Sequence, residues 1–257
     1  MIREAIEDDK INILKFCENT FSWGDYIADV WDYWQTERNL FVFEKNFPIG
    51  ICHAVFLKEH VWIEGIRIKP EFKRQGIASK LIKHVESLAI EKQIHSSLML
   101  IDTQNKPSLE MSQNLGYRSY QTWNFYSLLP GKNTTFEISY ANTLKENEFP
   151  HYVKSWRWIP LEKETISLLN RKNCIIHSGD EHKSTAILED SEHFKKTLIV
   201  TLFAGSDSNT VNLLYFLQNH GFEKKYQRVQ ILTKETLPKF ENLDFKLSFH
   251  LVQKLLS

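Results

Sequence analysis

The strongest chemical signal in the sequence is a short segment with two basic residues and one glycine, Lys73-Arg74-Gln75-Gly76-Ile77-Ala78. It lies between an apolar, β-branched run, Val61–Ile68, and apolar residues that recur at helical spacing from Ile77 onward. The first turn of a helix has backbone N–H groups without partners inside the helix, and these donors and the helix dipole suit an anion. Gly76 has no Cβ, which allows a close approach. The segment therefore predicts a diphosphate site at the start of a helix, and the alternative interpretation is an ordinary helix start that carries a glycine.

Glu64 is the candidate proton acceptor nearest to this segment, because it lies on the preceding run Val61–Ile68. An ammonium group is no nucleophile until a base has taken one of its protons. At the two-residue period of a strand, Glu64 shares a face with Ile66. The alternative interpretation is an ordinary solvated carboxylate on a strand.

Other reactive residues form no recognisable site. The three cysteines, Cys17, Cys52 and Cys174, are odd in number and far apart, which favours reduced thiols over a disulfide framework or a metal-ligand set. The ten histidines show no HxxxH or HxH grouping, so we expect no metal.

Composition indicates an ordinary globular protein of one large or two average domains. The chain has 257 residues, of which 42% are hydrophobic and 25% charged. Lys+Arg and Asp+Glu are both 32, so the net charge of zero argues against nucleic acid as the main partner. Neither a secretory signal nor a membrane-spanning apolar stretch is visible, and we expect a cytoplasmic protein that binds no membrane.

The first half predicts an α/β arrangement with a three-strand meander. Two helices with apolar faces should follow a first strand at 1–6. The meander covers Leu40–Glu44, Ile49–Leu57 and Val61–Ile68, and a long helix then runs from about Gly76 to Gln93. A strand Ser97–Asp102, a helix from Pro107 to Leu115 that stops at Gly116, and a strand Tyr117–Leu129 complete this half.

The breaker-rich Pro130-Gly131-Lys132-Asn133 suggests a boundary between domains 1–130 and 134–257. Expected strands in the second half are Thr135–Tyr140, 155–159, Cys174–His177, Thr185–Glu189, Leu198–Phe203, Tyr226–Leu232 and Phe245–Val252, with helices Glu162–Arg171 and Thr210–Asn219, the latter stopping at Gly221. The last strand could also be a helix. Leu98–Tyr117 and Leu198–Phe222 share a strand–turn–helix order, so the halves either repeat one fold or match by chance.

Residues 68–82, Ile-Lys-Pro-Glu-Phe-Lys-Arg-Gln-Gly-Ile-Ala-Ser-Lys-Leu-Ile, closely resemble the acetyl-CoA signature of the GNAT superfamily of N-acetyltransferases. That signature reads V-x-P-x-x-(R/Q)-x-x-G-x-(G/A)-x-x-L, and this chain departs from it only at Lys73. The resemblance covers about residues 1–129 and includes Asn105 and Leu115-Gly116-Tyr117. It implies the GNAT acyltransferase fold, a mixed and mostly antiparallel sheet flanked by helices, with a second, smaller GNAT-like α/β domain.

The resemblance also implies how acetyl-CoA, the expected cosubstrate, would bind. In this family the last meander strand and the strand after the long helix splay apart, and the pantetheine arm enters between them. The arm would pair with the backbone of Ile66, Arg67 and Ile68, and the diphosphate would contact Lys73, Arg74, Gln75, Gly76, Ile77, Ala78 and Ser79. Asn105 stands where the family often has an Asn that bonds the arm, although it can equally cap the helix that follows.

The family's usual general acid is a tyrosine four residues before the glycine of the final Gly-Tyr pair, and here that position is Ser112. A serine hydroxyl protonates a thiolate poorly, which puts the acid step in doubt. A free thiol has a pKa of about 8.5, so a thiolate leaves without much help near neutral pH. Tyr117, Tyr120 and Tyr126 are nearby in sequence.

The leading hypothesis is an enzyme that acetylates a primary amine on a small molecule, peptide or protein, with Glu64 as base and as a monomer or homodimer. The alternative, motivated by Ser112, is a non-catalytic module that binds acetyl-CoA or CoA as a sensor or scaffold. Another acyl donor or acceptor is a third possibility, since fold does not fix either. The second half lacks a glycine-rich loop before a long helix, so we expect it to have lost the cofactor site. Trp123, Trp156 and Trp158 would then line an acceptor pocket or be ordinary core aromatics.

Overall fold

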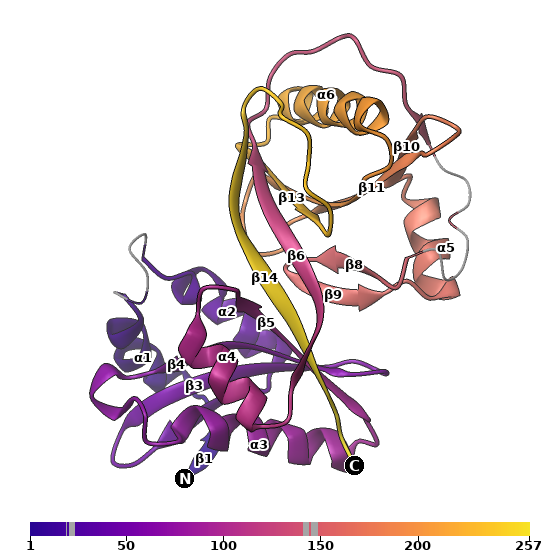
Figure 1. Cartoon of the computed structure of the whole chain (residues 1–257). Coiled ribbons are helices and arrows are strands. Elements are labelled where there is room, and N and C mark those ends of the chain that lie inside the picture. The colour runs from indigo at the N-terminus through magenta and orange to yellow at the C-terminus, as the bar shows by residue number, and fades with distance from the viewer. Residues whose placement is uncertain (19, 21–23, 141–143, 145–148) are drawn as a thin grey trace. The chain divides into compact units, whose positions relative to one another are not determined.

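A computed structural model describes residues 1–18, 20, 24–140, 144 and 149–257 (Figure 1). The helices in these residues are α1 Lys10–Cys17, α2 Ile27–Glu37, α3 Ile77–Glu91, α4 Lys106–Asn114, α5 Lys163–Arg171 and α6 Asp207–Glu223, with 3-10 turns at Glu7–Asp9 and Pro70–Phe72. The strands are β1 Ile2–Glu4, β2 Leu40–Glu44, β3 Pro48–Phe56, β4 Val61–Ile68, β5 Ser96–Asp102, β6 Arg118–Leu128, β7 Ser139–Tyr140, β8 His151–Lys154, β9 Arg157–Pro160, β10 Ile175–Ser178, β11 Ser184–Asp190, β12 Thr197–Phe203, β13 Arg228–Thr233 and β14 Leu243–Leu255.

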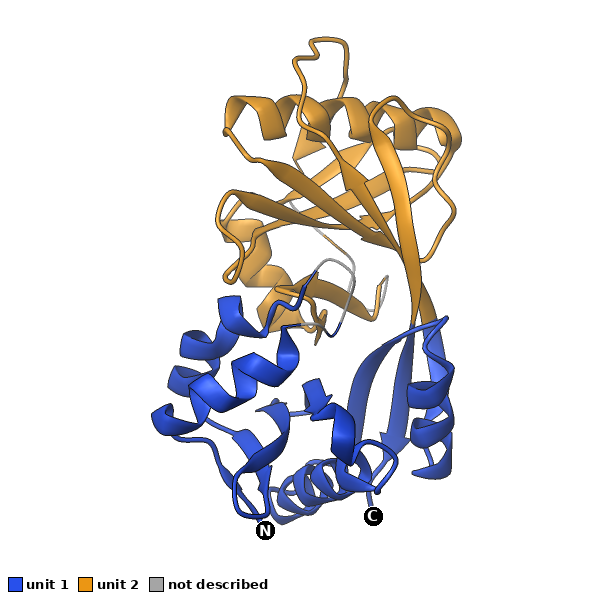
Figure 2. Ribbon diagram, turned by 90° about the vertical axis from the view of Figure 1, so that its left-hand side faces the viewer, with its two compact units in different colours: residues 1–121, 250–257 blue, residues 122–249 orange. Residues whose placement is uncertain are grey.

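The chain forms two compact units, which Figure 2 shows in blue and orange. Unit 1 contains Met1–Gln121 and His250–Ser257, and unit 2 contains Thr122–Phe249. The division differs from the predicted boundary at residues 130–134 in two ways: it falls between Gln121 and Thr122, within β6, and the end of β14 belongs to unit 1. There Gln253 Nε2 donates to Ser96 Oγ at 2.9 Å, and the Leu256 amide donates to the His95 carbonyl at 2.9 Å. A catalytic domain 1–130 and a cofactor-less domain 134–257 stay a prediction.

Unit 1 is built on a sheet with the strand order β1-β2-β3-β4-β5-β14. The pairs from β1 to β4 are antiparallel, and β4 pairs with β5 in parallel across the connecting helix α3. Successive side chains along the strands point to opposite faces of the sheet and pack into two separate hydrophobic cores. Phe41 packs in the cluster that contains the apolar face of α3, whereas Leu40 and Val42 pack with α1 and α2. The predicted meander, its crossover helix and the mixed, mostly antiparallel sheet are confirmed.

A bulge interrupts β4 at Gly65. Ile51 on β3 is opposite Arg67 and His53 is opposite Glu64, so β4 has one residue more than β3 between these two register pairs. Gly65 has φ +65°, and a Cβ there would lie 2.3 Å from Cη2 of Trp34 on α2. The extra residue breaks the two-residue alternation. Glu64 therefore faces α2, whereas Ile66 packs with the α3-side core. The prediction that Glu64 and Ile66 share a face was wrong for this reason.

Beyond the bulge, β4 and β5 separate. Their pairing runs from Val61↔Ser97 to Ile63↔Met99 and ends there, although β4 continues to Ile68 and β5 to Asp102. The edge of β4 from Glu64 onward thus loses its partner on the β5 side while it still pairs with β3 on the other.

Unit 2 repeats this arrangement with a different correspondence from the one predicted. β10, β11 and β12 form an antiparallel meander, α6 follows, and β13 pairs with β12 in parallel. Strand β12 and helix α6 therefore occupy the places of β4 and α3. The predicted match of Leu198–Phe222 to Leu98–Tyr117, which pairs β12 and α6 with β5 and α4, is therefore wrong. It rested on a strand, a polar turn, a helix and a closing glycine that occur in both segments.

Smaller differences also have physical reasons. α6 begins at the cap Ser206 and continues past Gly221 to Glu223. The predicted helix stop at Gly221 is therefore wrong. A Cβ at Gly221 would lie 3.0 Å from Val229 and 3.2 Å from Pro130, so the glycine permits close packing. The predicted strand at 135–140 is confined to β7, and the strand β8, which pairs with β9, was missed.

We predict that Gly65→Ala destabilises unit 1 by about 2–4 kcal/mol, because the new methyl group collides with Trp34 and the backbone there is left-handed. Urea unfolding followed by tryptophan fluorescence measures the change. Gly116→Ala is the matched control: φ is +92° there, but the nearest atom is 3.7 Å away on the flexible Lys254 side chain. Its cost should stay at about 1–2 kcal/mol. Equal costs for the two variants would contradict the assigned clash.

Candidate functional site

The connection from β4 to α3 forms a loop of exposed backbone donors. After the 3-10 turn, the Lys73 amide donates to the Pro70 carbonyl at 3.2 Å. The next amide in this described stretch that donates to a backbone carbonyl is that of Lys80, which bonds Gly76 at 3.0 Å. Arg74 has φ +60° and Gly76 has φ +73°, so left-handed residues alternate with Gln75. Such alternation turns successive N–H groups toward one side and makes an anion-binding concavity.

The loop is exposed but anchored. Lys73 to Gly76 are exposed, Ala78 and Ser79 are half-buried, and Ile77 is buried in the α3-side core. Because Ile77 fixes the start of α3, the amides before it are held in place while their donors remain accessible. The predicted diphosphate contacts thus lie together at one helix start.

The other predicted cofactor residues lie on β4 and before α4. Ile66, Arg67 and Ile68 lie on the part of β4 that no longer pairs with β5. The Arg67 side chain binds Asp25, with Nε 2.6 Å from Oδ2 and Nη2 3.0 Å from Oδ1, and its Nη1 donates to the Ile66 carbonyl at 3.1 Å. Asn105 is exposed and caps α4, its Oδ1 accepting from the Ser108 amide at 3.2 Å, so the capping interpretation is confirmed.

Glu64 is held by two buried neighbours. Trp62 Nε1 donates to Glu64 Oε2 at 3.0 Å, and His53 Nδ1 lies 2.9 Å from Glu64 Oε1. The Glu64 side chain is 14% exposed, so it is no solvated strand carboxylate. A half-buried carboxylate beside the diverging strands has the reach and chemistry of a proton acceptor.

His53 is a site residue that sequence reasoning missed. Its ring is fully buried on β3 and stacks on Trp34, with centroids 4.5 Å apart and planes 7° from parallel. Its Nε2 lies 3.2 Å from the Arg38 carbonyl oxygen. The only signal in the sequence is a histidine within an apolar run, and nothing local pairs it with Glu64, eleven residues away.

Hydrogen bonds elsewhere in the fold engage the hydroxyls of Ser112, Tyr117 and Tyr126. Ser112 is buried, and its hydroxyl donates to the Leu109 carbonyl of its own helix at 2.8 Å. The Tyr117 hydroxyl lies 2.7 Å from Ser97 Oγ at the paired end of β4 and β5, and burial raises the pKa of Tyr117. The Tyr126 hydroxyl, in unit 2, accepts from the Leu237 amide at 3.1 Å.

The predicted pocket tryptophans are packed within unit 2. Trp123 and Trp158 are buried and meet edge to face with centroids 5.3 Å apart. Trp156 Nε1 donates to Gln230 Oε1 at 3.0 Å, and its ring meets that of Phe125 edge to face. The core interpretation of Trp123 and Trp158 is therefore confirmed.

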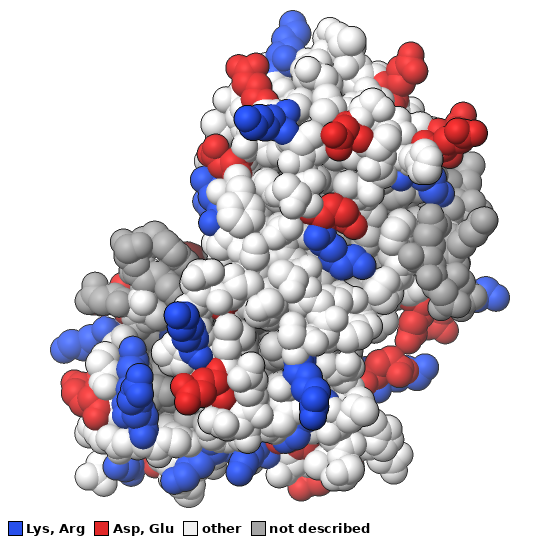
Figure 3. Space-filling view, in the orientation of Figure 1, with Lys and Arg blue, Asp and Glu red and all other residues white. Residues whose placement is uncertain are grey.

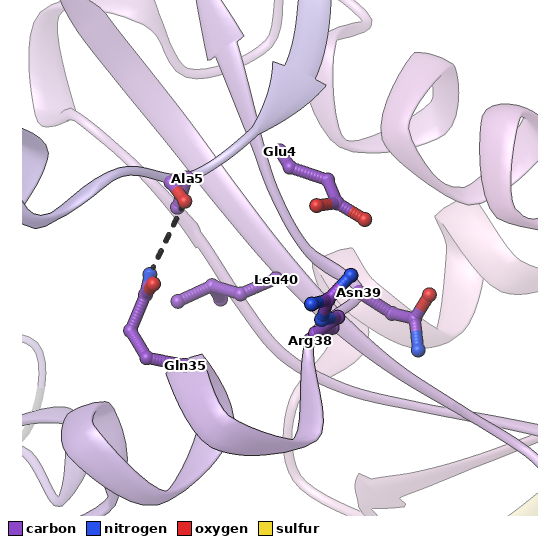
Figure 4. Close-up of a pocket in the computed structure, with 6 residues that line it drawn as sticks. All are labelled: Glu4, Ala5, Gln35, Arg38, Asn39 and Leu40. Carbon is purple, nitrogen blue, oxygen red and sulfur yellow. Dashed lines mark hydrogen bonds between the residues drawn. The ribbon is translucent and has the colours of Figure 1, made fainter.

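Figure 4 shows a small polar hollow in unit 1, between the end of β1 and the end of α2. Its volume of about 160 Å³ is below the range of about 300–1,000 Å³ that small-molecule sites occupy. It is lined by Glu4, Ala5, Gln35, Arg38, Asn39 and Leu40, and Gln35 Nε2 donates to the Ala5 carbonyl at 3.3 Å. Arg38 and Asn39 have φ +65° and +58°, and this turn presents the Arg38 carbonyl to His53.

The molecular surface carries charges of both signs. On the face in Figure 3, lysines and arginines alternate with acidic residues. Across the described ranges, no helix combines the length and apolar character needed to cross a membrane.

Residues 9–117 match the sequence model of the Acetyltransferase (GNAT) family. Two proteins named thialysine N-epsilon-acetyltransferase are similar over a shorter stretch. The one from Sus scrofa is 30% identical over 66 residues, 26% of this chain and 39% of the relative; the one from Bos taurus is 33% identical over 64 residues, 25% and 38%. The chain thus aligns with about two fifths of the length of these curated relatives.

Solved structures show the same fold over the whole chain. A Thermoplasma acidophilum protein superposes with a TM-score of 0.69 at 13% identity and covers 99% of both chains. A GCN5-related N-acetyltransferase from Sphaerobacter thermophilus gives 0.65 at 10% identity, covering 100% of this chain and 95% of that one. The GNAT fold predicted from residues 68–82 is therefore confirmed, and the sequence match to the GNAT acetyltransferase family covers residues 9–117.

The cysteines are placed for packing. Cys17, Cys52 and Cys174 are free and buried. Burial raises the pKa of the Cys17 thiol to about 12, and it also raises the pKa of Cys52 and Cys174, so all three stay protonated at neutral pH. A thiolate is the nucleophilic form of cysteine.

We predict that native protein reacts with the thiol reagent DTNB at pH 8 at least about a hundredfold more slowly than the same protein in 8 M urea, where three thiols per chain become accessible. Release of the coloured thiolate measures both rates. Rapid reaction of one native thiol would identify a nucleophilic cysteine and contradict this description.

Proposed function

We propose that the protein is an N-acetyltransferase that moves an acetyl group from acetyl-CoA to a primary amine by direct attack. The observation that carries this proposal is that two features occur together in unit 1, a loop of backbone donors and an open strand edge. A loop of unbonded amides opens α3, and β4 and β5 stop pairing at Ile63 just before it. A strand edge and a nest of donors beside one another suit a long ligand with an anionic diphosphate.

Acetyl-CoA would be held mainly by backbone groups. The amides of residues 74–79 would bind the diphosphate, with Lys73 and Arg74 supplying positive charge at the rim. The backbone of Ile66, Arg67 and Ile68 would pair with the pantetheine arm as a neighbouring strand would.

Glu64 would be the base. It takes one proton from the substrate ammonium, and the freed nitrogen attacks the thioester carbon. The carbon–sulfur bond breaks, and its electron pair leaves on the CoA sulfur. The nitrogen loses two protons in all, both of them to water, the first by way of Glu64; the thiolate takes up one proton from water, so one proton is released overall. Because the Ser112 hydroxyl is bonded within α4, the proposal uses solvent as the proton source for the thiolate.

The acceptor is proposed as a primary amine. The names of the pig and cattle relatives describe transfer to an N-epsilon group. Thialysine, lysine and simple alkylamines are therefore the first acceptors to test.

One cofactor site per chain is part of the proposal. The corresponding connection in unit 2, between β12 and α6, is only Ala204-Gly205-Ser206. A Cβ at Gly205 would lie 1.9 Å from the His182 carbonyl oxygen, so this loop is packed against its own chain. Ser206 caps α6 with its own hydroxyl, and Asp207 places a negative charge in the first turn, both unsuited to a diphosphate.

We predict that Lys73→Glu raises the Kd for acetyl-CoA about tenfold, which is about 1.4 kcal/mol, because the reversed charge repels the diphosphate. Titration calorimetry measures Kd and should give one site per chain. Lys83→Glu is the matched control, the same charge change on the exposed side of α3. Its Kd should change less than twofold. Equal effects of the two variants would remove the loop as the diphosphate site, and two sites per chain would contradict the assignment of unit 2.

We predict that Glu64→Gln lowers kcat by about 10²–10⁴-fold with little change in the KM for acetyl-CoA, because the amide cannot accept the ammonium proton. CoA release, followed with a thiol reagent, measures the rate. Glu59→Gln, in the exposed turn before the same strand, should keep wild-type activity. Acetyl-CoA binding without turnover on any amine would instead favour a non-catalytic sensor or scaffold, the function to which the missing tyrosine at Ser112 points.

A further inference from the structure

His53 is buried beside the proposed base in a way that fixes where its protons can be. It is the register partner of Glu64 across β3 and β4, and both of its ring nitrogens have oxygen partners. The inference rests on the proposed role of Glu64, but the protonation of this pair can be measured whether or not the protein turns over.

The hydrogen-bond geometry requires one proton more than a neutral histidine and a carboxylate hold between them. The Arg38 carbonyl can only accept, so His53 Nε2 carries a hydrogen. His53 Nδ1 faces Glu64 Oε1 at 2.9 Å, and a bond there needs a second proton, either on the ring or on the carboxyl group. The pair is therefore imidazolium with carboxylate, or neutral imidazole with carboxylic acid.

Three contacts favour the charged form. Trp62 Nε1 donates to Glu64 Oε2, which stabilises a carboxylate. Glu37 Oε2 lies 3.7 Å from His53 Nε2 and attracts an imidazolium. The Trp34 face lies parallel to the His53 ring at 4.5 Å, and an indole face attracts a cation.

Other titratable groups around the pair do not oppose this assignment. Burial raises the pKa of Tyr26 and of Cys52, and the Glu64 charge adds to both shifts, so both groups stay neutral at neutral pH. The nearby Arg67 charge is matched by Asp25. On α2, Trp34 is uncharged and Glu37 carries the negative charge described above.

We propose that His53 is a positioning residue that carries protons on both ring nitrogens and holds Glu64 as an oriented carboxylate for proton transfer. Its Nδ1–H donates to Oε1 while Trp62 Nε1–H donates to Oε2, so the two donors together fix the orientation of the carboxylate. The proton that Glu64 receives comes from the acceptor ammonium and leaves to water, and His53 keeps both of its protons throughout.

Loss of the imidazolium charge would change the proton affinity of Glu64 in a definite direction. A positive charge beside a carboxylate favours its ionised form, so removing the charge raises the proton affinity of Glu64. As the pH falls, Glu64 then becomes protonated, and stops acting as a base, at a higher pH than in the wild type. The acid limb of the pH profile of kcat/KM should move upward by about one pH unit.

Nitrogen-15 NMR of the imidazole rings tests the charge state directly. The protein is labelled at histidine, and His53→Gln identifies the His53 signals by their disappearance. We expect two alike, protonated ring nitrogens at pH 7 in the wild type, and a neutral tautomer in Glu64→Gln, where the negative partner is gone. A neutral His53 with the same shifts in both proteins would overturn the proposal, even if the enzyme acetylates amines.

Kinetics then test the positioning role. His53→Gln should shift the acid limb upward and lower kcat near pH 6 more than near pH 8, with the KM for acetyl-CoA within about twofold. His95→Gln, at an exposed position before β5, is the matched control and should leave the profile unchanged. An unshifted limb in folded His53→Gln would overturn the role. If His53→Gln does not fold, the comparison of wild type with Glu64→Gln by NMR still decides the charge state.

Discussion

The ring of Trp34 leaves no space for a side chain at residue 65, and the backbone there is left-handed, so β4 carries its extra residue as glycine. That bulge turns Glu64 toward α2 and His53 while Ile66 returns to the α3-side core. Pairing with β5 ends two residues earlier, at Ile63. The side of the sheet that the proposed base faces therefore depends on one local departure from regular strand geometry.

Both units use the same order of strands and crossover helix, yet they differ where a cofactor would bind. In unit 1 the connection to α3 runs from Lys69 through Gly76 and leaves its amides exposed. In unit 2 the connection to α6 is three residues long, and five register pairs hold β12 to β13. A repeat of the topology does not repeat the site, because a site made of backbone donors exists only where the chain leaves those donors unpaired.

Burying His53 and Glu64 together illustrates how a polar pair is tolerated in a core. A buried charge is costly unless it is paired and hydrogen-bonded. Here each ring nitrogen and each carboxylate oxygen has a partner, and the stacked Trp34 completes the enclosure. The Arg38 carbonyl reaches His53 because Arg38 and Asn39 adopt left-handed backbone conformations at the end of α2. The proposed site is thus supported by three elements, α2, β3 and β4.

The sequence by itself determined the elements of the first half and the position of the loop before α3, because hydrophobic periodicity and a contiguous loop are local properties of the chain. Tertiary structure decided the rest. The bulge at Gly65, the partnership of His53 with Glu64 and the return of β14 to unit 1 depend on pairing between distant segments. The match of α6 to α3 likewise required knowing that β12 and β13 are parallel neighbours. Local patterns specify which element forms, but strand register and burial specify which side chains meet.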